Sequence, residues 1–140
     1  MWIAYAFLSA IFAAAVAIFG KIGLKAIDST LATTVRAVIM AVFLLIVAVS
    51  MGKFSGWTFS SFGNKEWLMI ALSGIAGALS WLFYFYAIKT GQVTSVAAID
   101  RLSIVFIVIL ATLFLGEAFT WKTLVGALLI GGGAFLITLK

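Results

Sequence analysis

The sequence has no cysteine, no histidine and no proline. The lack of cysteine and histidine excludes disulfides, thiol chemistry, Cys/His zinc sites and acid–base catalysis by histidine. A Ser-His-Asp arrangement is impossible, and the chain also lacks a phosphate-binding loop of the GxxxxGK type. From these absences we expect a protein that is not an enzyme and that uses no metal and no other cofactor.

Charged residues are also scarce, because nine Lys and Arg and four Asp and Glu make up only 9% of the 140 residues. Hydrophobic residues make up 66%, whereas a soluble domain has about 25% charged and about 45–50% apolar residues. So few polar side chains cannot cover a water-exposed surface, and we predict an integral membrane protein in contact with the lipid bilayer. The net charge of +5 does not indicate nucleic acid, since the basic residues are scattered at the ends of apolar runs, where they suit anionic head groups.

Five apolar segments are long enough to cross a bilayer, which takes about 20 residues per helix. They lie at about residues 2–20, 31–51, 67–88, 93–115 and 121–139. Asp28 can cap the second segment, Gly91 and Gln92 break the third from the fourth, and Thr120 can cap the fifth. The first segment lacks a basic start and four more follow it, so we expect a retained span and not a signal peptide. The predicted fold class is all-α: a polytopic bundle of five transmembrane helices in one domain, residues 1–140, multi-pass in the cell (inner) membrane.

An odd number of spans puts the two termini on opposite sides of the membrane, which we call side A (N-terminus) and side B. Trp2, Trp57, Trp67 and Trp121 all fall at side A, as half of an aromatic belt, and we expect the loop 52–66 to lie along that interface. The lysines are Lys53, Lys65 and Lys122 at side A, against Lys21, Lys25, Lys89 and Lys140 at side B. This small excess favours side B as cytoplasmic, and a bias so small permits insertion in both orientations.

Three charged residues lie inside predicted spans: Arg36 in the second, and Asp100 and Arg101 in the fourth. Each costs about 2.5–3.5 kcal/mol near a helix centre, so they must be paired, hydrated or both. Adjacent helical residues point about 100° apart, which makes Arg36 a better partner for Asp100 than Arg101 is. One interpretation is an ion pair that fixes helix packing, with Arg101 reaching side B; the other, which we favour, is a hydrated cavity lined by these residues.

Three further residues complete the candidate substrate site. Ser103 is one turn from Asp100 on the same face, and Trp81 and Tyr84 can stack on a ring or a cation or serve in packing alone. The predicted substrate-binding residues are therefore Arg36, Trp81, Tyr84, Asp100, Arg101 and Ser103. Small residues of the third and fifth helices are expected to let backbones approach closely in lipid, the fifth helix in helix contact or dimerisation. Those residues are Gly74, Gly77, Ala78, Gly126 and Gly131–Gly133.

Two short motifs and a glycine-rich end carry a family resemblance. "YFYAIKTG" (84–91) closes the third helix, "LFLGE" (113–117) closes the fourth, and four glycines follow in the fifth. With these features the chain resembles the EamA family of the drug/metabolite transporter superfamily, and residues 12–40 also look like that family's opening helices. The resemblance implies a ten-span architecture of two inverted five-span halves, of which this chain looks like one. The chain departs from the common family pattern at two places. Ile104 stands where many members have a proline, and "DRLS" (100–103) looks like the D-[K/R]-L-S motif of a half-size subgroup.

The resemblance implies a secondary transporter that works by alternating access, and an unfused half can rebuild the inverted pair only with an oppositely oriented copy. We therefore expect an antiparallel homodimer; a parallel homodimer and a heterodimer with another small protein stay open. The expected cargo is a small polar or zwitterionic metabolite, amino acids first, because charges of both signs suit carboxylate and ammonium groups. The first span contains no acid, which argues against drug export. The alternatives are a subunit of a heterodimeric lipid-linked-sugar flippase and a non-transporting structural subunit.

Overall fold

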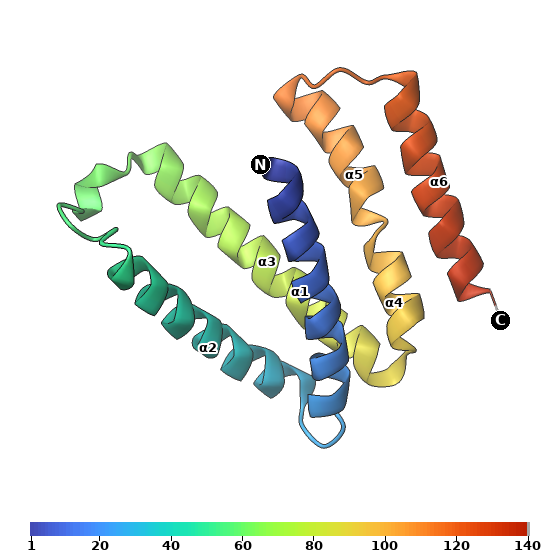
Figure 1. Ribbon diagram of the computed structural model, residues 1–140, viewed down its shortest axis with the longest axis horizontal. Coiled ribbons are helices and arrows are strands. Elements are labelled where there is room, and N and C mark those ends of the chain that lie inside the picture. The colour runs from blue at the N-terminus through green and yellow to red at the C-terminus, as the bar shows by residue number, and fades with distance from the viewer. Residues whose placement is uncertain (140) are drawn as a thin grey trace. The chain divides into compact units, whose positions relative to one another are not determined.

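The computed structural model describes residues 1–139, and these form helices with no strand among them (Figure 1). The helices are α1 (Trp2–Gly23), α2 (Ser29–Ser50), η1 (Phe59–Ser61), α3 (Asn64–Thr90), α4 (Val93–Asp100), α5 (Ser103–Leu110), η2 (Ala111–Leu115) and α6 (Trp121–Thr138). Five stretches are long and apolar enough to cross a membrane, with α4, α5 and η2 together forming the fourth. The prediction of an all-α, five-span membrane protein is confirmed. Lys140, one of the predicted side B cations, lies outside the described residues.

Side-chain caps define where two of the spans begin. The carboxylate of Asp28 accepts hydrogen bonds from the backbone N–H groups of Thr30 (2.9 Å) and Leu31 (3.0 Å), so α2 begins two residues before the predicted start at 31. The Thr120 hydroxyl accepts from the N–H of Thr123 at 3.2 Å and caps α6. Both predicted caps are confirmed, and each satisfies N–H groups that a helix start leaves without partners.

The fourth span is not one continuous α-helix, contrary to the single helix predicted over 93–115. Arg101 and Leu102 form a turn between α4 and α5, with helical backbone angles tightened toward a 3-10 geometry. The bonds across the turn join residues three apart: the N–H of Leu102 donates to the carbonyl of Ile99 at 2.9 Å, and that of Ile104 to Arg101 at 3.1 Å. Short 3-10 stretches inside helices are typical of hinges and functional sites.

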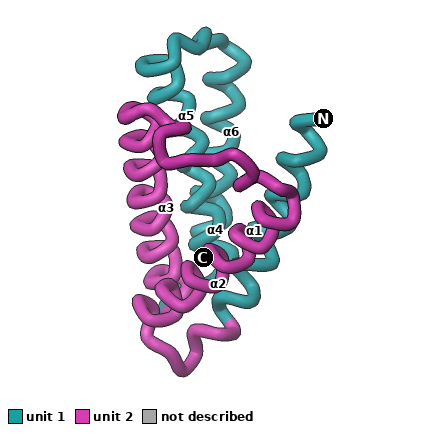
Figure 2. The backbone as a smooth tube through the Cα atoms, turned by 90° about the vertical axis from the view of Figure 1, so that its left-hand side faces the viewer, with its two compact units in different colours: residues 1–21, 90–140 teal, residues 22–89 magenta. Residues whose placement is uncertain are grey.

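The chain divides into two compact units, shown in different colours in Figure 2. Unit 2 is residues 22–89 and contains α2, η1 and α3; unit 1 is residues 1–21 together with the segment from Thr90 onward. Within unit 2, α2 and α3 approach each other at their Ser29 and Lys89 ends and diverge toward the loop that joins them (Figures 1 and 2). The single domain over residues 1–140 stays a prediction.

In unit 2, polar contacts tie the converging ends of α2 and α3 together. The hydroxyls of Thr30 and Tyr86 lie 2.6 Å apart, and the ammonium of Lys89 donates to the carbonyl of Ile27 at 2.9 Å. The N–H groups of Leu31 and then Thr30, with the charge of Lys89, hold the pKa of Asp28 below its ordinary value of 3.8, although desolvation opposes them. At the side B end of unit 2, polar contacts therefore join α2 to α3 and to the residues before α2.

At the other end of unit 2, the loop between α2 and α3 folds on its own aromatic side chains. Trp57 contacts Phe59 with ring centroids 4.9 Å apart, and Phe62 contacts Trp67 edge-on at 5.4 Å. The indole N–H of Trp67 donates to the carbonyl of Phe59 at 3.1 Å. An amphipathic cluster of this kind suits a head-group boundary, where one end of a tryptophan is apolar and the other wet.

In unit 1, both α4 and α5 pack against α6, and Lys21 of α1 donates to the carbonyl of Gly91 at 2.9 Å. Among residues 1–139, Gly131 is the one glycine of α6 whose Cβ position approaches a neighbouring element, at 3.9 Å from Cδ2 of Leu102. At Gly126, Gly132 and Gly133 no described atom outside the backbone of α6 lies within 4 Å of that position. Helix contact within the chain therefore involves Gly131, and a dimer role for the other three stays a prediction.

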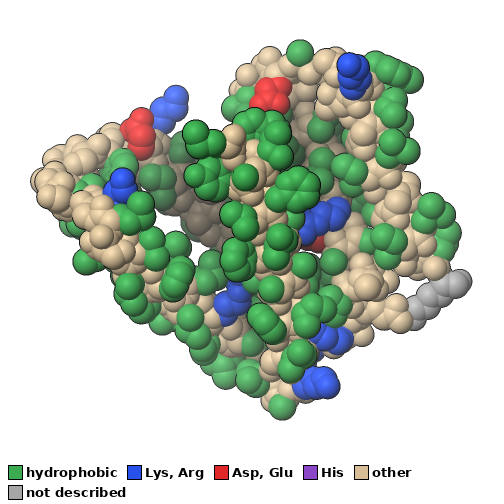
Figure 3. Space-filling view, in the orientation of Figure 1, with side chains coloured by type: hydrophobic (Ala, Val, Ile, Leu, Met, Phe, Trp, Pro, Cys, Tyr) green, Lys and Arg blue, Asp and Glu red, His purple; other side chains and the backbone are tan. Residues whose placement is uncertain are grey.

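The surface of both units is mainly hydrophobic. Green apolar side chains are spread over the whole face seen in Figure 3, between tan backbone and other groups, with few charged side chains among them. Buried apolar side chains are few: only Leu24, Phe85 and Ile88 are both large and buried in residues 1–139. Lipid acyl chains match such a surface, so helix contacts here depend on packing and polar bonds more than on the hydrophobic effect.

Candidate functional site

Arg36 lies about 10 Å along α2 from Ser29, at about 1.5 Å per residue, which places its charge within the membrane span. Its guanidinium carbon is 3.8 Å from the centroid of the Trp81 ring and 5.4 Å from that of Phe85. Both distances are within the about 6 Å over which a cation is attracted to an aromatic face. The predicted stacking role of Trp81 therefore has a partner in unit 2, the guanidinium of Arg36.

The rings under Arg36 form a compact cluster on α3. Trp81 contacts Phe85 at 5.9 Å with an interplanar angle of 79°, and Tyr84 contacts Trp81 at 5.6 Å and 78°. Phe85 is only 3% exposed, so its ring is fixed by its neighbours, and its contact with Trp81 restricts the movement of the Trp81 ring. Edge-to-face pairs of this kind add about 0.5–1.5 kcal/mol beyond the area they bury. The cluster is therefore a rigid platform for the cation.

The α2 face that carries Arg36 is polar over two further turns. Ser29, Thr33 and Arg36 are spaced four and three residues apart and so share one face of the helix. Thr33 is buried and its hydroxyl donates to the carbonyl of Ser29 at 2.7 Å. The hydroxyl of Ser29 is buried, 1% exposed, and has no hydrogen-bond partner in residues 1–139. A buried hydroxyl without a partner is rare, and here it continues the polar face from Arg36 toward side B.

In unit 1, Arg101 lies in the turn between α4 and α5, and Asp100 and Ser103 flank it. All three are exposed, although they lie in the middle of a span of 23 residues. Lipid cannot hydrate a carboxylate or a guanidinium, so charges that unit 1 leaves exposed at this depth need water or an oppositely charged partner. Asp100 ends α4 and Ser103 begins α5, so the turn separates two residues that the sequence places on one continuous helical face.

The backbone at this turn also has polar groups that need a partner. Within residues 1–139, no backbone hydrogen bond reaches the carbonyl of Asp100 or uses the N–H of Ser103. An unsatisfied backbone group in hydrocarbon is costly, and irregular backbone inside a membrane occurs where it is buried in protein or lines a hydrated cavity. The break therefore adds two polar backbone groups to the charges of Asp100 and Arg101.

The six predicted site residues fall into two groups. Arg36, Trp81 and Tyr84 come together in unit 2, and Asp100, Arg101 and Ser103 come together in unit 1. The predicted ion pair between Arg36 and Asp100 joins residues of different units and stays a prediction. Sequence reasoning missed Phe85, although its spacing of four residues from Trp81 puts both rings on one face of α3.

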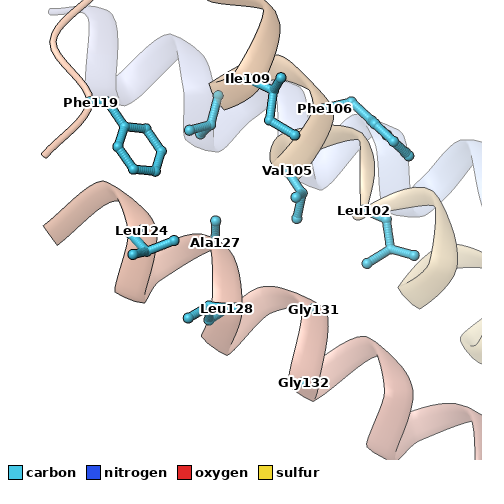
Figure 4. A pocket seen from close by; sticks show the side chains of 11 residues that line it. Leu102, Val105, Phe106, Ile109, Phe119, Leu124, Ala127, Leu128, Gly131 and Gly132 are labelled. Carbon is cyan, nitrogen blue, oxygen red and sulfur yellow. The ribbon is translucent and has the colours of Figure 1, made fainter. Parts of the chain in front are cut away.

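A second feature of unit 1 is an apolar hollow of about 500 Å³ between α5 and α6. Figure 4 shows Phe119 at one end and Leu102 at the other, with Val105 and Ile109 of α5 facing Ala127 and Leu128 of α6. Gly131 and Gly132 complete the α6 wall near Leu102. The lining side chains are all apolar, so this hollow suits an acyl chain or another apolar group and has no side chain that could hold a charged solute.

Comparison with known proteins identifies relatives of the chain. The sequence profile of the EamA-like transporter family matches residues 1–139. A Sinorhizobium sp protein named "Uncharacterized transporter in cobO 3'region" is 39% identical over 136 residues, which cover 97% of this chain and 95% of that protein. No solved structure matches the chain.

Proposed function

The chain belongs to the EamA-like transporter family, and on that premise we propose that it is one half of a secondary transporter for small polar or zwitterionic metabolites in the cell (inner) membrane. As a family member with five membrane-spanning segments, it is a multi-pass membrane transporter of the drug/metabolite type and not an enzyme. The proposal goes further in naming the cargo class, the site and the assembly.

The observation that carries the proposal is the break in the fourth span. Asp100, which ends α4, and Arg101, which lies in the turn, are both exposed, and the backbone there has polar groups without backbone partners. Transporter sites near the middle of the bilayer are typically built from interrupted helices of this kind. We therefore propose that Asp100, Arg101 and Ser103 of unit 1 belong to a hydrated cargo site, and Arg36, Trp81 and Tyr84 of unit 2 stay predicted cargo-binding residues.

The assembly follows from the number of spans. A half with five spans meets its inverted counterpart only in a second molecule of opposite orientation, and the nearly balanced lysines permit such insertion. In the proposed antiparallel homodimer, the two copies rock against each other around the charged site and open it to each side in turn. The copies share one sequence, so each contributes the same charged residues.

The charges favour cargo that carries both signs. Asp100 suits an ammonium group, whereas an arginine fork suits a carboxylate. Amino acids have both groups and are therefore the first cargo class to test.

The test is exchange of radiolabelled amino acids in proteoliposomes. Wild-type protein is expected to exchange at least one of the twenty, and Asp100→Asn and Arg101→Leu are expected to lower its rate at least tenfold. A matched control is Lys53→Gln, which removes a charge from the loop between α2 and η1, outside the spans, and should leave the rate unchanged. Full exchange by Asp100→Asn and Arg101→Leu would refute the site, and a wild-type protein that exchanges none would refute amino acids as the cargo.

The hollow of unit 1 supports a second candidate function, a subunit of a heterodimeric flippase for a lipid-linked sugar. Its apolar walls of Val105, Ile109 and Ala127 suit the hydrocarbon part of an amphiphile. A flippase subunit should be unstable without its partner protein, whereas a self-sufficient carrier should purify as a homodimer. Size measurement of the purified protein in detergent therefore separates the two functions.

A further inference from the structure

The cation on α2 and the rings on α3 form an unusual arrangement for a membrane interior. Trp81 and Phe85 lie 5.9 Å apart and nearly perpendicular, and they make a corner against which the guanidinium of Arg36 rests. The nearer ring, Trp81, is also the aromatic residue that attracts cations most strongly. The position of the guanidinium is therefore set by two rings.

The two rings cover only part of the guanidinium, and N–H donors that point away from the rings stay available. Its five N–H donors lie in the plane of the group and form a fork whose geometry matches a carboxylate. Within unit 2, Arg36 makes no ion pair and no hydrogen bond, and its guanidinium contacts the rings of Trp81 and Phe85. A half-buried cation with such donors is a binding group that unit 2 itself does not use.

We propose that Arg36, held on the corner of Trp81 and Phe85, is a carboxylate-binding subsite and that the cargo carries a carboxylate. This inference rests on the proposed function, since it names the group by which that site holds its cargo. Arg36 is the binding residue, and Trp81 is a positioning residue that acts through it. A planar monoanion fits better than a phosphate, because one fork supplies one charge and the nearest hydroxyl on this face, that of Thr33, already donates to Ser29.

The arrangement predicts that arginine cannot be replaced by lysine here. Arg36→Lys keeps the charge, but it loses the fork and most of the stacking on Trp81. Trp81→Leu is expected to weaken carboxylate binding through loss of the platform, and Trp81→Phe is expected to restore part of it. The matched controls are Phe83→Leu, at a residue of the same helix that is 66% exposed, and Lys25→Gln, a cation outside the spans.

The experiment compares acids with their amides. Purified protein in nanodiscs of zwitterionic lipid is titrated with each L-amino acid and with its carboxamide, and binding is followed by thermal shift, since a ligand stabilises the folded state. At least one acid is expected to bind at least tenfold more tightly than its amide. Arg36→Lys should abolish that preference, and the two controls should keep it. Equal binding of acid and amide, an unchanged preference in Arg36→Lys, or no binding of any acid would overturn the proposal.

Two outcomes separate the subsite from the transport function. Arg36-dependent binding of an acid, with no exchange of it in wild-type proteoliposomes, would leave the subsite standing and refute transport of that cargo. Exchange that keeps its preference for acid over amide in Arg36→Lys would leave the transport function standing and refute the subsite. The comparison of acid and amide in the wild type needs no variant, so it stays decisive even where Arg36→Lys folds poorly.

Discussion

The contact between Arg36 and Trp81 can be measured as a coupling free energy. The perturbation is a double-mutant cycle of Arg36→Met, Trp81→Leu and the pair, with unfolding by sodium dodecyl sulfate in mixed micelles followed by circular dichroism. Arg36→Met alone gives an ambiguous result, because it removes a favourable contact and also a charge that is expensive in an apolar environment. The cycle removes this ambiguity, since effects that do not depend on the partner cancel.

The structure sets the expected size of the coupling. A cation over a ring contributes about 0.5–1 kcal/mol when exposed and about 2 kcal/mol when desolvated. Arg36 is partly exposed and lies 3.8 Å from the Trp81 ring, so we expect about 1 kcal/mol, which is about a fivefold change in the unfolding equilibrium constant. Phe85 is farther, at 5.4 Å, and phenylalanine attracts cations less, so the coupling of Arg36 with Phe85→Leu should be smaller.

The same cycle with Phe83→Leu is the control, because that exposed ring of α3 should show no coupling to Arg36. Free energies that simply add for Arg36 and Trp81, within about 0.3 kcal/mol, would show that the contact contributes nothing and would refute the platform on which the carboxylate subsite depends.

Three other predictions concern packing, pH and orientation. Ile88 is 0% exposed and Ile75 of the same helix is 59% exposed, so Ile88→Ala should lower the unfolding free energy by about 2 kcal/mol and Ile75→Ala by far less, measured in the same micelles. The lowered pKa of Asp28 stabilises the fold above its ordinary pKa of 3.8, and this contribution is lost as the pH falls through the folded value. The wild-type melting temperature should therefore fall more steeply than that of Asp28→Asn on acidification from about pH 5 to about pH 2, and parallel curves would contradict this. Single cysteines from Lys25→Cys and Ser55→Cys, in a chain that has no cysteine of its own, should each react with an impermeant maleimide from both sides of the membrane; labelling from one side only would exclude dual insertion.

The fold was largely predictable because the length of an apolar run decides whether a segment crosses a bilayer. Asp28 and Thr120 were predictable caps for a similar reason, since their side chains alone can satisfy the N–H groups of the helix starts that follow. The break at Arg101 and Leu102 was not predictable from local signals. Neither residue is proline or glycine, and both keep right-handed helical angles, so helix propensity gives no signal for the tightened turn.

The candidate site was predictable in its charges and less so in its contacts. A charge inside a span is visible in the sequence, which is why Arg36, Asp100 and Arg101 could be named. That Trp81 is the ring under Arg36, with Phe85 behind it, depends on how α2 and α3 converge, and no residue pattern gives that angle. The unsatisfied backbone at the break is likewise a property of the folded turn.

The most direct test of the account is a cross-link between copies of opposite orientation. Ser55→Cys protein with one tag is expressed together with Lys25→Cys protein with another, and intact cells receive an impermeant bifunctional maleimide. In an antiparallel dimer, side A of one copy and side B of the other face the same compartment, so we predict products that carry both tags. Cross-links between like copies alone would show that all copies face the same way and would contradict the proposed half-transporter assembly.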